Sequence, residues 1–574
     1  MINIVHWQGY IFYANVLNIQ PHSLTSCAAN RSDTRRTHPP RLTASLRLLI
    51  PQNMNIRRYL IMSHPHIAPD SHGIPTLYVN GRPFFLYSGE IHNSAASSLA
   101  YMEEHVWPNL ENLNMNAVIL PIFWELLEPA EGQFDFKLTD GLITQARRHE
   151  KKLVLLWFGL WKNAESMYVP QWMKKDTKTY FRAETVRGEK TTTISPFCKA
   201  AVEKDAYAFA ALMDHIRAFD EEESTVLVIQ VENEIGILGE ARDYCQAAQE
   251  EFAKEIPQIL KENLHVEGSW KEAFGPEAEE TFMAWHFAAA VERIASAGKE
   301  KYNLPCYANS WLKQYPWYPG SYPMGGPVPS MHKIWKLAAP SLFALAPDIY
   351  VPYCADVMDE YAGAENPLFI PEIRKDAVAA SYCLYAFGAK NAVCFAPFGI
   401  EELALDPSQI PKPAPEVMTA LNIDPSAFDT RGSFEILSET YRLLKNLEPV
   451  YLEYRGTKHL KSFVRHGEND YGTFLSFEDY DLQAAYAPRQ SGKPLGAGIF
   501  IETAKDTFFL IGLMCSASFR VKPGERSTAD ILRIEEGTFE KGEWRPGRVL
   551  NGDEKMTVRF GDKPAVYKVK LYKF

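Results

Sequence analysis

Short apolar runs and longer stretches with helical period alternate between about residues 75 and 450. The run 226–231 is rich in β-branched residues and too short for a typical helix, and this is the pattern of a strand covered on both faces. Stretches at about 98–113, 138–149, 201–219 and 434–447 predict helices. An alternation of this kind predicts a parallel sheet whose faces are covered by helices.

Eight such runs can be counted, which predicts a (β/α)₈ TIM barrel. The Asn80-Gly81 pair lies between two apolar runs and predicts a hairpin turn before the first barrel strand. Right-handed crossovers then place all eight strand ends on one face. The expected strands are 84–91, 117–124, 153–158, 226–231, 305–309, 349–353, 368–370 and 392–396.

The apolar period changes to two after Gly456, and Gly, Asp and Pro turns separate the runs. This predicts a C-terminal antiparallel domain, expected to be a β-sandwich. The predicted strands there are 458–465, 473–477, 498–502, 507–513 and 565–572. The domains expected are a catalytic barrel at 71–450 and a β-rich domain at 451–574.

Residues 1–70 have many arginines, few acids and no clear apolar period. Such a composition occurs in organelle transit peptides. The preferred interpretation is a disordered N-terminal extension, or a segment upstream of a true start at Met54 or Met62. No clear secretory signal is evident and no run of eighteen apolar residues occurs, so no membrane span is expected and the cytoplasm is slightly favoured.

Two of the predicted barrel strands end in carboxylates. Glu234 follows the strand at 226–231, and Glu372 follows the strand at 368–370. The interval of 138 residues (372 − 234) leaves room for about three strand-helix units between them. Two carboxylates at the mouth of one barrel are the catalytic equipment of a glycosidase.

Several motifs resemble those of a known group. The motifs are SGEIH at 88–92, WELLEP and EGQFDF within 124–136, PQW at 170–172 and VENEIG at 231–236. Their order and content are similar to the family 35 β-galactosidases of the clan A retaining glycoside hydrolases, with some likeness to family 42. The resemblance implies that Glu234 is the acid/base, that Glu372 is the nucleophile and that Asn233 holds the sugar 2-hydroxyl.

The chain departs from this family where galactose contacts are expected. Asn93 follows the GEIH motif, Pro121 stands on strand two where the family has Tyr, and 161–163 replaces an Ala-Glu pair. The chain therefore resembles a divergent branch. The further sugar-binding candidates are Glu90, His92, Trp124, Glu125, Trp161, Asn163, Trp311 and Tyr353. The loop 314–329 either closes the pocket with aromatic side chains or packs on the barrel rim.

Composition excludes several function classes. The net charge of −11 and the pI of 5.8 argue against nucleic acid as a partner. The eight cysteines show no CxxC spacing and are expected to be buried free thiols. No HExxH pattern occurs, so neither a metal nor another cofactor is expected.

The leading hypothesis is an exo-acting retaining β-galactosidase that removes terminal β-galactosyl residues from oligosaccharides or plant polysaccharide side chains by double displacement. Its alternatives are another retaining β-glycosidase, such as a β-glucosidase, and a non-catalytic barrel that binds carbohydrate. The sequence does not decide the oligomeric state.

Overall fold

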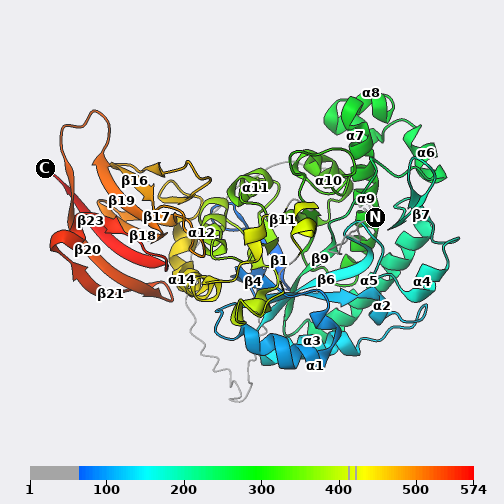
Figure 1. Ribbon diagram of the computed structural model, residues 1–574, viewed down its shortest axis with the longest axis horizontal. Coiled ribbons are helices and arrows are strands. Elements are labelled where there is room, and N and C mark those ends of the chain that lie inside the picture. The colour runs from blue at the N-terminus through cyan, green and yellow to red at the C-terminus, as the bar shows by residue number, and fades with distance from the viewer. Residues whose placement is uncertain (1–63, 412–413, 421–422) are drawn as a thin grey trace, which may run out of the picture. The chain divides into compact units, whose positions relative to one another are not determined.

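The computed structural model describes residues 64–574 except 412–413 and 421–422 (Figure 1). Most of the predicted extension therefore lies outside the described residues. Its last residues differ from the prediction, because β1 (His66–Pro69) pairs antiparallel with β2 (Pro75–Val79). The predicted hairpin turn at Asn80-Gly81 joins β2 to β3 (Arg82–Pro83).

Eight parallel strands close into a barrel, which confirms the predicted (β/α)₈ fold. Neighbouring strands follow one another along the chain, and the last pairs with the first. The strands are β4 (Leu86–Glu90), β5 (Ala117–Phe123), β6 (Lys152–Lys162), β9 (Val226–Asn233), β10 (Cys306–Trp311), β11 (Leu342–Ile349), β12 (Phe369–Ile373) and β13 (Cys394–Pro397).

The prediction of strand six was wrong. The run 349–353 combines Ile, Tyr and Val and has high strand propensity, but only Ile349 lies in β11. The chain leaves the barrel at Tyr350 and starts α11 at Cys354. Residues 342–349 form the strand instead, although Pro347 interrupts their apolar pattern. Tertiary contacts in the barrel override the local strand propensity.

Helices cover the outside of the barrel in Figure 1. The predicted helix at 98–113 is instead a succession of short turns, α1 (Leu99–Tyr101), a π-helix at 102–106 and a 3₁₀ turn at 107–110 that contains Pro108. The other helices are α2 (Trp124–Leu127), α3 (Lys137–Arg148), α4 (Gln171–Lys175), α5 (Lys199–Asp220), α6 (Gln246–Phe252), α7 (Gln258–Leu264), α8 (Trp270–Phe274), α9 (Ala278–Lys299), α10 (His332–Ala338), α11 (Cys354–Tyr361), α12 (Ala379–Lys390), α13 (Pro415–Ala420) and α14 (Ser433–Tyr454).

Two antiparallel sheets form the C-terminal part, and one apolar cluster contains residues from both, as a sandwich requires. The larger sheet has the order β14-β17-β18-β23-β20-β21 and the smaller β15-β16-β19-β22. Their strands are β14 (Leu460–Val464), β15 (Gly472–Ser476), β16 (Tyr480–Tyr486), β17 (Ala497–Ala504), β18 (Thr507–Leu513), β19 (Cys515–Val521), β20 (Ala529–Glu540), β21 (Glu543–Leu550), β22 (Val558–Arg559) and β23 (Ala565–Lys573). A separate hairpin of β7 (Arg182–Glu184) and β8 (Lys190–Ile194) follows strand three of the barrel.

The seven cysteines in the described part of the chain are buried free thiols, as predicted. Cys27 lies outside the described residues. Within residues 64–574, apart from the two short gaps, no helix combines the length and the apolar character needed to cross a membrane.

A buried ion pair ties the β1–β2 hairpin to the end of α14. The guanidinium of Arg455 contacts the Asp70 carboxylate at 2.6 Å, and both side chains are almost fully buried. Arg455→Met leaves that carboxylate buried without its partner, and we expect a loss of about 3 kcal/mol in the free energy of unfolding. Arg442→Met on the exposed side of α14 is the control, with an expected loss below about 0.5 kcal/mol. Denaturant unfolding measures both, and equal losses would contradict the assignment.

Candidate active site

A cavity of about 460 Å³ opens where the barrel strands end. It contains both predicted catalytic carboxylates and a large apolar surface. This volume lies in the range of small-molecule sites. The lining residues are His92, Asn163, Glu234, Trp311, Leu312, Gln314, Asp348, Tyr350, Glu372, Lys375, Phe398, Glu402, Ile410, Pro411, Ala414, Met418, Ile423 and Phe428.

Glu234 lies just beyond the end of β9, held by the neighbouring strand. Its backbone N–H donates to Asn309 Oδ1 at 3.1 Å, and Asn309 Nδ2 donates to Asp348 Oδ2 at 2.6 Å. The backbone of Glu234 has a φ of +54°, a conformation that non-glycine residues seldom adopt and that often marks functional sites. Gly236 allows this exit, because a Cβ there would lie 2.4 Å from the Pro323 carbonyl carbon.

Glu372 lies on β12, and Tyr350 donates a hydrogen bond to its Oε1 at 2.7 Å. One carboxylate oxygen from each of Glu234, Asp348 and Glu372 lies within 4.8 Å of the other two. The roughly 5–5.5 Å between carboxyl groups in retaining glycosidases agrees with this arrangement, whereas inverting enzymes need roughly 6.5–9.5 Å. A metal ion could in principle bind these three groups, but the ammonium of Lys162 nearby opposes a further cation.

Burial and mutual repulsion favour the protonated forms of these carboxyls. Burial raises the pKa of Glu234 to about 7, while the hydrogen bond with Asp348 and the charge of Lys162 act in the opposite direction. Burial and the charge of Glu234 raise the pKa of Glu372 above its usual range, against the Tyr350 hydrogen bond and Lys162. A protonated acid and an ionised neighbour are what glycoside cleavage needs.

Lys162, the last residue of β6, is buried among these carboxylates. Burial lowers the pKa of its ammonium well below the usual range, and the charges of Glu372, Glu234 and Glu90 oppose that shift. Its Nζ also lies 4.8 Å from the centre of the Phe158 ring. Lysine at this position favours the ionised form of each nearby carboxylate.

Lys162→Met is expected to lower kcat/KM about 10²-fold on a neutral β-glycoside. Without the ammonium, the pKa of Glu372 rises further, so a smaller fraction is ionised at neutral pH and the acidic limb of the pH profile moves to higher pH. The control is Lys152→Met at the opposite end of the same strand, which should leave the profile unchanged. An unshifted acidic limb in Lys162→Met would show that Lys162 does not tune the carboxylates.

Three of the predicted sugar-binding residues line the cavity: His92, Asn163 and Trp311. His92 Nδ1 lies 3.0 Å from Glu401 Oε1, and its Nε2 lies 3.5 Å from Glu402 Oε1. Two carboxylates therefore orient the imidazole at the cavity wall.

Glu90 and Asn233 are buried at the ends of β4 and β9 and are absent from the cavity lining. Burial and then the charge of Glu372 raise the pKa of Glu90 well above its usual range. The effect of Glu372 on this pKa indicates that Glu90 lies close to the Glu372 carboxylate, behind the cavity wall.

Four other candidates are not in the cavity wall. Trp124 is in the core and donates to Glu128 at 2.7 Å, and Glu125 pairs with Lys174 at 2.8 Å. Trp161 is fully buried, with its indole N–H bonded to the Ile194 carbonyl oxygen. Tyr353 lines a separate surface hollow. Each has a structural partner or another location, so the structure gives these four no contact with the cavity.

The loop 314–329 packs mainly on the barrel rim. Met324 and Ile237 exchange backbone hydrogen bonds, which attaches the loop to the exit of β9. Gln314 lines the cavity, but Trp317 and Tyr318 do not, and Lys313 Nζ lies 4.0 Å from the centre of the Trp317 ring.

Several cavity residues were missed from the sequence. Asp348 and Tyr350 were hidden by the misplaced strand six, since a correct end at Ile349 puts both at the catalytic face. Lys375 and Glu402 form an ion pair in the wall, and a lysine three residues after Glu372 was a signal that could have found Lys375. The stretch 410–428 has no regular period, and nothing in its pattern indicated a cavity wall.

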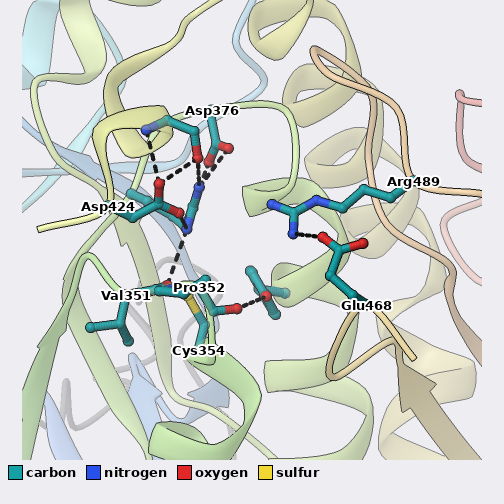
Figure 2. A network of polar contacts seen from close by, with 10 residues as sticks. Val351, Pro352, Cys354, Asp376, Asp424, Glu468 and Arg489 are labelled. Atoms are coloured by element: carbon teal, nitrogen blue, oxygen red, sulfur yellow. Dashed lines mark hydrogen bonds and ion pairs between the residues drawn. The ribbon is translucent and has the colours of Figure 1, made fainter. Parts of the chain in front are cut away.

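An arginine network fixes the chain beyond Glu372. The Arg374 guanidinium donates to both Asp376 oxygens at 2.7 and 2.8 Å, to Asp424 Oδ2 at 2.8 Å and to the Val351 carbonyl oxygen at 3.1 Å. Figure 2 shows Asp376, Asp424 and Val351 arranged around this group. The network joins the exits of strands six and seven to the segment that begins at Asp424.

Comparison with known families agrees with this geometry. Residues 76–309 match the model of glycosyl hydrolases family 35, and residues 437–561 match a domain of unknown function, DUF5597. This part of the barrel is similar to glycosyl hydrolases family 35. The family 35 match includes Glu234 but ends before Glu372, so the position of Glu372 comes from the barrel geometry alone.

The curated relatives cover only a small part of either chain. Beta-galactosidase 14 of Arabidopsis thaliana is 27% identical over 167 residues, which are 28% of this chain and 17% of the relative. Beta-galactosidase 13 of the same plant is 25% identical over 167 residues, 28% of this chain and 18% of the relative. The chain thus spans less than a fifth of the length of each.

Solved structures with similar folds include a beta-galactosidase from Bacillus circulans sp. alkalophilus, with a TM-score of 0.46 and 10% identity over 84% of this chain and 99% of that chain. The catalytic domain of a beta-amylase from Paenibacillus polymyxa has a TM-score of 0.43 and 12% identity, and the match covers 55% of this chain and 92% of that chain.

Proposed function

We propose that this protein is a retaining β-glycosidase that acts on terminal β-galactosyl groups. The observation that carries the proposal is the spacing of Glu234 and Glu372, with carboxylate oxygens within 4.8 Å of each other at strand ends of a family 35-related barrel. An inverting enzyme needs a water molecule between one carboxylate and the anomeric carbon, and this spacing leaves no room for it.

In this proposal Glu372 attacks the anomeric carbon while Glu234 gives its proton to the departing glycosidic oxygen. The leaving group departs as an alcohol and a glycosyl ester forms on Glu372. Glu234 then takes a proton from water, whose oxygen displaces Glu372 and restores the starting configuration at the anomeric carbon. Tyr350 stabilises the Glu372 carboxylate when it is ionised.

Unpaired acceptors at the site fit a ligand with many hydroxyl groups. Among the described residues that line the cavity, three buried side-chain oxygens have no hydrogen-bond partner, and each would accept from a sugar hydroxyl. They are Asn163 Oδ1, Asp348 Oδ1 and Glu372 Oε2. A buried acceptor without a partner is costly, and a bound pyranose would remove that cost.

The galactosyl and exo parts of the proposal have narrower support. The two plant relatives are named beta-galactosidases, and the motifs of residues 88–236 are similar to that family. One side of the cavity is closed by side chains from Ile410 and Pro411 and from described residues between Ala414 and Phe428, which favours binding of a chain end over an internal unit. Because 161–163 departs from the family where galactose contacts are expected, another retaining β-glycosidase activity, such as that of a β-glucosidase, is the alternative.

Two measurements test the proposal. A panel of nitrophenyl β-glycosides identifies the sugar, and proton NMR of early product identifies its anomer. We expect the β-galactoside to be hydrolysed best and β-galactose to appear first. First formation of the α-anomer would contradict the retaining mechanism, and absence of turnover on the whole panel would favour a carbohydrate-binding barrel.

Digestion of a galactose-decorated polysaccharide tests the exo mode. Free galactose should appear while the viscosity stays nearly constant. An early fall in viscosity would mean internal cleavage and would contradict the exo mode without affecting the retaining mechanism.

A further inference from the structure

The cavity wall divides into a polar part and an aliphatic part. The polar part consists of the catalytic carboxylates with His92, Asn163, Gln314, Asp348, Tyr350, Lys375 and Glu402. The aliphatic part lacks side-chain hydrogen-bonding groups and consists of Leu312, Ile410, Pro411, Ala414, Met418 and Ile423. A glycosyl group that reacts must lie between Glu234 and Glu372, so the aliphatic surface is available to whatever is attached to that sugar.

The position of the aliphatic surface relative to Glu234 supports its assignment to the leaving group. Leu312 directly follows β10, the strand whose Asn309 holds the backbone of Glu234. The acid must reach the glycosidic oxygen, so the leaving group lies on the Glu234 side of the sugar. The aliphatic wall therefore begins next to the place where the leaving group is expected.

The far side of this wall is anchored to the catalytic strands. The N–H of Asp424 donates to the Tyr350 carbonyl oxygen at 3.1 Å, and the N–H of Lys375 donates to that of Ala427 at 2.9 Å. The Phe428 ring stacks on Tyr350 at 5.4 Å between centroids. The guanidinium of Arg374 also donates a hydrogen bond to Asp424 Oδ2 at 2.8 Å. These contacts make the segment 423–428 a fixed wall of the cavity.

Aliphatic side chains distinguish between kinds of leaving group. A second sugar would bury hydroxyl groups against Leu, Ile and Met side chains that offer no hydrogen bonds, and each unpaired hydroxyl would cost free energy. An alkyl group has no such cost and gains from removal of apolar surface from water. The wall thus favours an aliphatic leaving group over a second sugar.

We infer that the cavity has a leaving-group subsite for alkyl chains, so the preferred substrates are β-glycosides of aliphatic alcohols. This inference rests on the proposed glycosidase function and specifies its substrate class. Oligosaccharides remain substrates, but with a lower kcat/KM than alkyl glycosides of the same sugar.

The test is a homologous series of methyl, propyl, butyl, pentyl and hexyl β-galactosides, kept below the concentrations at which they aggregate. From propyl to hexyl the leaving alcohols have similar acidity, so the slope against chain length reports contact with the wall. We expect kcat/KM to rise about two- to fourfold per added methylene until the subsite is full. If the nitrophenyl panel shows another sugar, the series is made on that sugar.

Two variants test whether the alkyl chain of the substrate contacts the aliphatic wall. Met418→Gln and Leu312→Asn place polar groups in the wall and should each reduce the slope to less than half of its wild-type value. Leu405→Asn is the matched control, because Leu405 is 39% exposed and does not line the cavity. The slope is a ratio of rates from one preparation, so partial unfolding of a variant does not alter it.

The outcomes are separable. A flat or falling series with wild-type protein that hydrolyses the methyl glycoside overturns the alkyl subsite and leaves the glycosidase proposal standing. If the slope in both wall variants stays as large as in Leu405→Asn, the alkyl chain of the substrate binds elsewhere. That result also overturns the alkyl subsite. Absence of turnover on every glycoside overturns the proposed function, and the subsite with it.

Discussion

Glu372→Gly is expected to lower kcat/KM by about 10⁴-fold or more on a nitrophenyl β-galactoside. Glycine removes the nucleophile and leaves a space beside the anomeric carbon, while Tyr350 keeps its position by packing on Phe428. Azide can occupy that space and attack from the same side, so it should restore part of the activity and give the α-galactosyl azide. NMR of the product identifies the anomer.

The matched control is Glu125→Gln. Glu125 follows β5 on the same face of the barrel but pairs with Lys174 and does not line the cavity, so its loss should change kcat/KM by less than about threefold. Formation of the α-azide by Glu234→Gly instead of Glu372→Gly would show that the two carboxylates have exchanged roles.

The barrel could be predicted from the sequence because its strands are covered on both faces. Runs such as 226–231 are apolar at nearly every residue, with Gln230 as the exception, and burial of both faces leaves this near-continuous pattern. Glu234 and Glu372 stood out because each interrupts such a pattern where a strand ends. Their meeting within 4.8 Å then follows from the closure of the barrel, which brings all strand ends to one face.

Strand six shows where this reasoning fails. Tyr350, Val351 and Tyr353 have higher strand propensity than the run at 342–348, which is rich in Leu and Ala. Each run contains one proline, so proline does not distinguish them. The strand is fixed by pairing with β10 and β12, contacts that a local pattern does not contain. The error displaced the predicted strand end and hid Asp348 and Tyr350 from the list of candidate residues.

Lys162 and the aliphatic wall were hidden for a different reason. A lysine at the end of a strand is usually exposed, and only the arrangement of four strand ends around it makes this one buried. Residues of the stretch 410–428 acquire their role because Asp424 and Ala427 bond to the exits of strands six and seven. Such long-range contacts leave no periodic signal. Trp124 and Trp161 lie near motifs in the sequence, but the structure places both in the core and outside the cavity lining.

Glu234→Gly is expected to have an effect that depends on the leaving group. A glycoside of a poorly acidic alcohol needs a proton on its departing oxygen, so kcat/KM should fall by about 10²–10⁴-fold. Dinitrophenolate leaves without that proton, so the rate at which a dinitrophenyl glycoside forms the glycosyl ester should fall by less than about tenfold. Azide should accelerate turnover of the dinitrophenyl substrate and give the β-galactosyl azide, because it attacks the glycosyl ester on the face that water normally uses.

The pH profile gives the same variant a second readout. In the wild type the acid must be protonated, so kcat/KM should fall as the pH rises through about 7, where burial places the pKa of Glu234. This alkaline limb should be absent from Glu234→Gly on the dinitrophenyl substrate. The control is Glu401→Gln, which alters the carboxylate beside His92 and should retain the limb. A limb that persists in Glu234→Gly would assign the acid to another group, and Asp348, which lies within hydrogen-bond reach of Glu234, would be the next residue to replace.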